Sequence, residues 1–315
     1  LENVGILLLL ALPGFICAKT KLLNKEKALP TLSVILLYIC TPFVTFNAFL
    51  RTDFKSEILL NLVAVFLITA LITTLSAVIT VFAYKPLVKD LDLDKNPRGV
   101  MAYASSFGNV GYLCIPFLQF LMPGNLEVVL YASTGVVAFN ALSWTLGNYL
   151  LSYDKKHIGL KKAVLNPNTI AFVLVLPLFI LNLNFNRTDK TDSLANAISL
   201  VANLVGPLAM FVVGINFADI KFKELFTDAK AYVAVGAKLL LQPVLAFGIV
   251  MLCSLFMDIS AFKLNVIAFA AMPSANNLLM FCSLLNKDTS LATKGIMLST
   301  LMSIVTIPLA LTLFV

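Results

Sequence analysis

SSFGNVGYLCIPFLQF, residues 105–120, and IAFAAMPSANNLLMFC, residues 267–282, decide the fold of this 315-residue chain. Each stretch is apolar enough for a membrane interior, yet each carries helix-interrupting residues near its middle. Glycine has no side chain to hold a helical conformation, and proline removes a backbone donor and clashes with the preceding turn. We therefore predict that each stretch breaks into two half-helices.

Composition places the rest of the chain in the bilayer as well. Hydrophobic residues make up 60% of the sequence, charged residues make up 12%, and the mean hydropathy is +0.95. A soluble domain carries roughly twice that charged fraction. A membrane span needs about 20 mostly apolar residues, and lipid offers no partner for free backbone groups, so each such segment is expected to be a helix. Ten segments qualify: 3–18, 28–50, 58–84, 100–121, 128–153, 163–184, 196–217, 231–256, 264–285 and 296–315.

The basic residues predict the orientation of these spans. Loops after odd-numbered spans hold 17 Lys and Arg residues, and loops after even-numbered spans hold five. Positive residues collect on the cytoplasmic side, so both termini are expected to be extracytoplasmic. The net charge of +7 is thus a topology signal and not a nucleic-acid footprint. No basic residue precedes segment 3–18, so we expect a span there and no cleavable signal peptide.

Five spans in each half of the chain predict an inverted repeat, because an odd number of spans reverses the second half in the membrane. The halves are residues 1–157 and 158–315. A spacing of 165 residues pairs Pro42 with Pro207 and Phe46 with Phe211, and sets Gly108 against Pro273.

The two interrupted stretches fall in corresponding spans of the halves, the fourth and the ninth. Broken helices in matching positions are the best sequence pointer to a secondary transporter's binding site. The alternative is that Gly and Pro are simply common in membrane helices and that the Asn side chains join neighbouring helices. The clustering of Ser274, Asn276 and Asn277 at the second break favours a site.

Other chemistry finds little support in the sequence. The five cysteines lie in apolar segments without a CxxC pair, and the only histidine, His157, lies in a basic loop. A metal site, a histidine-based triad or a bound cofactor is therefore not expected, and we do not expect an enzyme.

The motifs resemble those of a known family. FGNVGYLCIP resembles the Gly-Asn-x-Gly-(aromatic)-x-x-x-Pro segment of the auxin efflux carrier family, and AAMPSANNLLMF is similar to that family's second crossover. KLLLQPVLAF and STLMSIVTIPLAL also resemble family patterns. The resemblance implies an all-α fold of ten helices in two inverted repeats, like NhaA and the bile acid symporters. Helices 4 and 9 then cross, helices 1, 2, 6 and 7 form a scaffold, and helices 3–5 and 8–10 form a moving domain. It also implies a homodimer paired through span 2 or 7, with apolar faces around Val34, Leu37 and Leu204.

The same resemblance assigns residues to a substrate site. Asn109, seven residues before Pro116, matches a substrate-contacting Asn of plant members, and Pro273 matches the second crossover Pro. The chain departs from plant members in having Asn276 and Asn277 after Pro273, and in lacking a long hydrophilic central loop, so auxin itself is in doubt as substrate. The full candidate set is Asn47, Asn109, Gly111, Tyr112, Pro116, Lys238, Pro273, Ser274, Asn276 and Asn277.

Charge inside the spans predicts the substrate class. Lys238 is the only ionisable residue well inside a span, where it could take part in function, snorkel to the cytoplasmic surface or meet unwound carbonyls. No span holds Asp or Glu, so carboxylate-mediated coupling is unsupported, and half-helix N-termini favour an anion. We expect an elevator-type exporter of small organic carboxylates in a bacterial inner membrane. The alternatives are a symporter coupled to H⁺ or Na⁺, the latter held by carbonyls with Ser274, Asn276 or Asn277, and a sensor that binds without transport.

Overall fold

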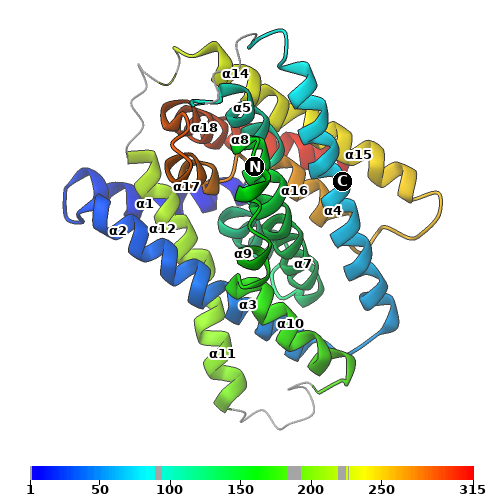
Figure 1. Cartoon of the computed structure of the whole chain (residues 1–315). Coiled ribbons are helices and arrows are strands. Elements are labelled where there is room, and N and C mark those ends of the chain that lie inside the picture. Colours follow the sequence, from blue (N-terminus) through cyan, green and yellow to red (C-terminus); the bar gives the residue numbers. More distant parts are fainter. Residues whose placement is uncertain (1, 89–93, 184–192, 219–224, 226) are drawn as a thin grey trace. The chain divides into compact units, whose positions relative to one another are not determined.

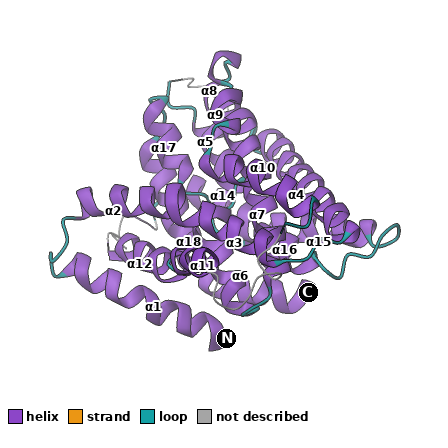
Figure 2. Cartoon of the chain, turned by 90° about the horizontal axis from the view of Figure 1, so that it is seen from below, coloured by secondary structure: helices purple, strands orange, loops and turns teal. Residues whose placement is uncertain are grey.

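The computed structural model describes residues 2–88, 94–183, 193–218, 225 and 227–315, with side chains from residue 9 onward. These residues form helices joined by loops and turns (Figure 2). Within the described ranges, strand-like pairing is confined to one isolated antiparallel bridge between Gly108 and Ser274. The all-helical prediction is therefore confirmed.

Among the described residues, six helices are long and apolar enough to cross a membrane. They are Lys25–Arg51, Ser56–Ala83, Leu126–Ser152, Ser193–Ala218, Ala229–Cys253 and Thr289–Phe314. A seventh crossing is possible if Lys155–Val164 and Pro167–Ile180, which meet at 45°, act as one span. Leu9–Lys19 and Val110–Leu121 are shorter apolar helices. The protein is thus an integral membrane protein, whereas ten spans in two inverted halves stay a prediction.

The individual helices follow the predicted segments closely. In the first half they are α1 (Glu2–Lys19), α2 (Lys25–Val34), η1 (Ile35–Cys40), α3 (Thr41–Arg51), α4 (Ser56–Ala83), α5 (Pro97–Ser106), η2 (Val110–Cys114), α6 (Ile115–Leu121), α7 (Leu126–Leu142), η3 (Ser143–Gly147), α8 (Asn148–Ser152) and η4 (Lys155–His157). In the second half they are α9 (Leu160–Val164), α10 (Pro167–Ile180), α11 (Ser193–Asn203), α12 (Val205–Ala218), α14 (Ala229–Gly236), η6 (Ala237–Leu241), α15 (Gln242–Cys253), α16 (Lys263–Ala271), α17 (Asn277–Leu284) and α18 (Thr289–Phe314).

Three of these helices carry a π-helical turn directly before a proline. The turns η1, η2 and η6 end one residue before a helix whose second residue is Pro42, Pro116 or Pro243. A proline has no N–H for the preceding turn and its ring crowds the carbonyl four residues back, so a widened turn relieves the clash while the helix continues. These prolines therefore widen their helices without ending them.

The chain divides into two compact units, each built from both halves of the sequence. One unit comprises Leu1–Val65, Gly111–Val137 and Leu165–Ile220, and the other comprises Phe66–Val110, Ala138–Val164 and Lys221–Val315. Spans 1, 2, 6 and 7 fall in the first unit and spans 8 to 10 in the second, whereas spans 3 to 5 are divided between them. The assignment of a scaffold and a moving domain stays a prediction.

In the first unit, α1 and α12 lie side by side at very short range (Figure 1). A Cβ atom built on Gly14 would stand 2.0 Å from the Phe211 carbonyl oxygen, and one built on Gly214 would stand 1.9 Å from the Ala11 carbonyl oxygen. Small residues allow helix backbones to approach this closely in a membrane, where van der Waals packing drives association. The two glycines therefore set the α1–α12 distance.

We expect Gly214→Ala to force α1 and α12 apart, because the added methyl group overlaps a backbone carbonyl that cannot rotate away. Overpacking of this kind costs about 1–3 kcal/mol. The measurement is the thermal unfolding midpoint of the purified protein in detergent. Gly206→Ala on the same helix is the control, since a Cβ there meets nothing within 4 Å; equal midpoints for the two variants would contradict the packing role of Gly214.

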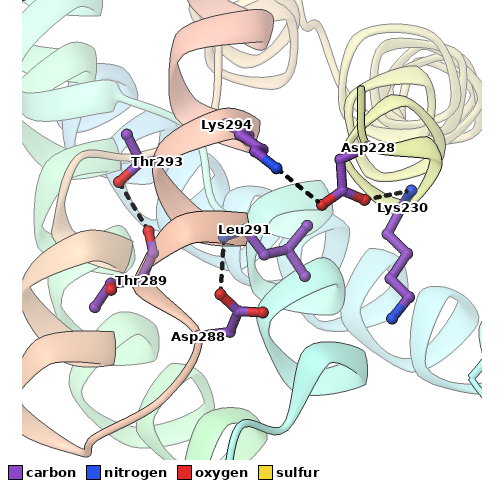
Figure 3. Close-up of polar contacts among 7 residues, drawn as sticks. All are labelled: Asp228, Lys230, Asp288, Thr289, Leu291, Thr293 and Lys294. Atoms are coloured by element: carbon purple, nitrogen blue, oxygen red, sulfur yellow. Dashed lines mark hydrogen bonds and ion pairs between the residues drawn. The ribbon is translucent and has the colours of Figure 1, made fainter. Parts of the chain in front are cut away.

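In the second unit, aspartates cap the starts of α14 and α18 (Figure 3). The Asp228 carboxylate accepts a hydrogen bond from the Lys230 backbone N–H, and the Asp288 carboxylate accepts one from the Leu291 N–H, both at 3.0 Å. Lys294 of α18 also pairs with Asp228 at 3.5 Å and so joins the two helix starts. His157 lies exposed in η4, as expected from its basic loop.

Candidate functional site

Both motif-bearing spans are interrupted where the sequence predicts. Helix α5 ends at Ser106, its capping residue Phe107 is extended, and the chain resumes a helical path at Val110. Helix α16 ends at Ala271, Met272 is extended, and α17 begins at Asn277. The interruptions near Asn109 and Pro273 are thus confirmed.

The two interruptions pair with each other inside the second unit. The Asn109 N–H donates to the Pro273 carbonyl at 2.7 Å, and the Ala275 N–H donates to the Phe107 carbonyl at 2.9 Å. Gly108 and Ser274 stand opposite each other in the resulting antiparallel bridge. Backbone groups freed by a broken helix need partners at membrane depth, and here each break supplies partners to the other.

We call the paired interruptions, residues 107–109 and 272–276, the crossing. Ser274 is fully buried and anchors the crossing to neighbouring helices. Its hydroxyl donates to the Ala104 carbonyl of α5 at 2.7 Å, and its backbone N–H donates to the Ser299 hydroxyl oxygen of α18 at 3.0 Å. Ser274 therefore ties the crossing to α5 through its side chain and to α18 through its backbone.

Lys238 lies at the ends of both broken helices. Its Nζ donates to the Ala270 carbonyl at 3.0 Å, in the last turn of α16, and to the Gln242 Oε1. Gln242 in turn donates from Nε2 to the Ser106 carbonyl at 2.7 Å, at the end of α5. The Lys238 side chain is 0% exposed, so it does not snorkel to the surface. Of the alternatives left by the sequence, contact with carbonyls at a helix break is the one observed.

A small cavity of about 20 Å³ adjoins this arrangement. Its lining includes Thr69 and Thr73 of α4, Gly108, Gln242 and Ala270. The buried Thr69 hydroxyl has no hydrogen-bond partner among the described residues. A space of this size admits one water molecule, which the Thr69 hydroxyl could bind.

The asparagines beside the crossing keep their side-chain amides open to a ligand. Asn109 precedes η2, and Asn276 and Asn277 open α17, with Asn276 in the N-cap position but without a side-chain cap bond. None of the three side chains is hydrogen-bonded within the described part of the chain. Asn109 is only 5% exposed, yet its amide atoms keep a small accessible surface, so a ligand can still reach them. A bound polar molecule would supply the missing hydrogen bonds.

The remaining candidate residues belong to the first unit. The Asn47 side-chain oxygen accepts from Arg51 Nε and from the Ser199 hydroxyl, both at 3.0 Å, so it already has two protein partners. Tyr112 is half-buried, and a Cβ on Gly111 would meet only Leu37, at 3.7 Å. Pro116 is buried near the start of α6. A substrate role for these four residues stays a prediction.

Sequence reasoning missed two residues that shape the crossing. Gln242 joins Lys238 to the end of α5, and its place four residues after Lys238 on one helical face was a usable signal. Gly108 belongs to the motif but not to the candidate set, although a Cβ there would stand 3.0 Å from Lys238 Nζ and 2.9 Å from the Phe269 carbonyl oxygen. No sequence signal distinguished Gly108 from Gly111.

An apolar helical chain whose two broken helices pair at buried backbone is the architecture of a membrane transport protein. The comparisons with known proteins agree. The model of a family described as "Membrane transport protein" matches residues 1–161 and 156–311. The chain is also 26% identical, over 98% of its length and 96% of the other's, to a protein of Methanothermobacter thermautotrophicus described as an uncharacterized transporter. The chain belongs to this membrane transport protein family, the auxin efflux carrier family.

Proposed function

We propose that this protein is a secondary carrier that moves small organic carboxylate anions across the membrane. The observation that carries the proposal is the nearly buried Asn109 amide, which has no hydrogen-bond partner within the described chain and stands where one half-helix gives way to the next. Asn276 is the N-cap residue at the start of α17 and Asn277 is its first residue, so both stand where the second break gives way to a half-helix. Amide N–H groups and the N-terminal ends of helices both favour a carboxylate.

The charge distribution supports an anion over a cation at these positions. Asp and Glu are absent from the ten apolar segments, and the one Lys or Arg inside them is Lys238. A cation at the asparagines would meet no negative side chain there, whereas a carboxylate would meet amide donors and helix N-termini. Membership of a transport family also favours transport over catalysis.

The proposed cycle is an elevator in which a moving domain carries the substrate past a scaffold. Transport needs no cofactor in this scheme, and the carboxylate moves alone, outward, across a plasma membrane that is negative inside, with both termini extracytoplasmic. Two protomers pair through the scaffold, where Val34 and Leu204 are about half exposed, at 53% and 52%. A symporter coupled to H⁺ or Na⁺ and a non-transporting sensor are the competing schemes.

Substitution of the asparagines tests the site. We expect Asn109→Ala and Asn277→Ala each to weaken substrate binding by about 1–3 kcal/mol, or roughly 5- to 150-fold, because each removes one partner of a buried hydrogen bond. The measurement is half-saturation of counterflow in liposomes, after a screen of labelled mono- and dicarboxylates identifies a substrate. Thr293→Ala is the control, since that hydroxyl bonds only to the Thr289 carbonyl of its own helix.

Affinities within twofold of the parent at both positions would remove the asparagines from the site. Saturable binding without counterflow would favour the sensor. Counterflow of cations or neutral solutes in place of carboxylates would contradict the proposed substrate class.

A further inference from the structure

The C-terminal ends of α5 and α16 carry partial negative charge that no basic residue of either helix offsets. A helix C-terminus bears a partial negative charge, which a cationic side chain in the last turn commonly offsets. Neither α5 nor α16 has a basic residue in its last turn. Both helices end in the buried part of the second unit, where water does not screen that charge.

The offsetting charge comes from a third helix. Lys238 lies in the π-helical turn η6, and its buried ammonium donates directly to the Ala270 carbonyl at the end of α16. Gln242 extends the contact, since its oxygen accepts from Lys238 while its nitrogen donates to the Ser106 carbonyl at the end of α5. One cation thus serves both helix ends, one directly and one through an amide.

Gly108 allows this cation to stand between the breaks. A Cβ at that position would lie 3.0 Å from Lys238 Nζ, so the missing side chain of Gly108 leaves the space that the ammonium fills. The cavity of about 20 Å³ lined by Gly108, Gln242 and Ala270 adjoins this space and can hold one water molecule.

In carriers with broken helices, unwound carbonyls and half-helix C-terminal ends are the groups that coordinate a bound Na⁺ ion. In this chain those groups are already bonded to Lys238 and Gln242. We propose that Lys238 is a built-in cation of the crossing. Its ammonium offsets the partial negative charge of the two helix C-termini as a bound metal cation would, so the stability of the crossing does not depend on Na⁺. Lys238 is a positioning residue in this role and does not touch the substrate.

This inference bears on the driving ion of the proposed carrier, but its test uses thermal stability and no substrate. Failure of the carrier hypothesis in a flux assay therefore leaves the test intact. The first arm uses the parent protein in detergent, titrated with NaCl against choline chloride at equal ionic strength. We expect the same thermal unfolding midpoint in both salts, and a saturable rise with Na⁺ alone would overturn the proposal.

The second arm removes the Lys238 ammonium by substitution and adds a soluble cation in its place. Lys238→Ala is expected to unfold at a lower temperature, and Na⁺ or ethylammonium is expected to restore at least about 2 °C of that loss in a saturable manner, because a ligand that binds only the folded state raises its midpoint. Lys230→Ala, at an exposed position of the adjoining helix α14, is the matched control and should show no such response.

Lys238→Gln separates charge from packing and guards against failure of the alanine variant to fold. Glutamine fills most of the space and can still donate to the Ala270 carbonyl, but it carries no charge. A cation response in this variant supports the built-in cation. Midpoints of both Lys238 variants that are the same in Na⁺, ethylammonium and choline would show that the residue acts only by packing, and would overturn the proposal.

Discussion

Gly108→Ala is expected to destabilise the protein by about 1–3 kcal/mol, because the new methyl group has no space at the crossing. It would stand 2.9 Å from the Phe269 carbonyl oxygen and 3.0 Å from Lys238 Nζ, which is itself held by Ala270 and Gln242. Neither neighbour can withdraw without breaking a buried hydrogen bond or moving the α16 backbone. The thermal unfolding midpoint of the purified protein should fall by several degrees.

The matched control is Gly111→Ala, three residues along the same motif. A Cβ at Gly111 meets only the flexible end of Leu37, at the ordinary contact distance of 3.7 Å. The midpoint of this variant should stay within about 1 °C of the parent. If the two variants lose stability equally, the motif glycines act through backbone flexibility and not through the space that Gly108 leaves for Lys238.

Membrane potential is expected to drive accumulation of the substrate in reconstituted liposomes. A carboxylate that moves without a co-ion carries one charge per cycle, worth about 2.3 kcal/mol per 100 mV, which corresponds to a gradient of roughly 50-fold. The charge of Lys238 returns with the empty carrier, so it does not alter this limit. The measurement is the steady-state distribution of a labelled monocarboxylate with the potential clamped by K⁺ and valinomycin.

A dicarboxylate provides the internal comparison, because two charges per cycle square the limiting gradient at the same potential. Protein-free liposomes measure the leak. Accumulation that follows an imposed H⁺ or Na⁺ gradient and ignores the potential would reject uniport and favour a cation-coupled symporter.

The breaks in the fourth and ninth spans could be predicted because glycine and proline act locally on the backbone. The two prolines nevertheless play different parts. Pro273 lies inside the break and accepts a hydrogen bond from Asn109, whereas Pro116 follows a widened turn and lies within α6. A single sequence shows that a proline disturbs a helix, but tertiary contacts decide whether the helix ends or only widens.

The partners of Lys238 could not be predicted, because they depend on distant parts of the chain. Its ammonium reaches a carbonyl 32 residues away, and Gln242 reaches one 136 residues away. Helical periodicity places Lys238 and Gln242 on one face, but it does not specify which helix end that face meets. Likewise, Asn47 resembles the other asparagines in sequence, and only the structure shows that Arg51 and Ser199 already occupy its oxygen.

The pairing of Phe107 and Asn109 with Ala275 and Pro273 uses backbone atoms alone. This pairing requires the small residue Gly108 and depends on the number of residues in each loop, since one insertion would shift every partner by a position. The side-chain amides of Asn109 and Asn276 take no part in this pairing, so they can be exchanged to suit a different substrate while the backbone pairing is kept. Relatives with other substrates are expected to differ at Asn109 and Asn276 and to keep the lengths of both loops.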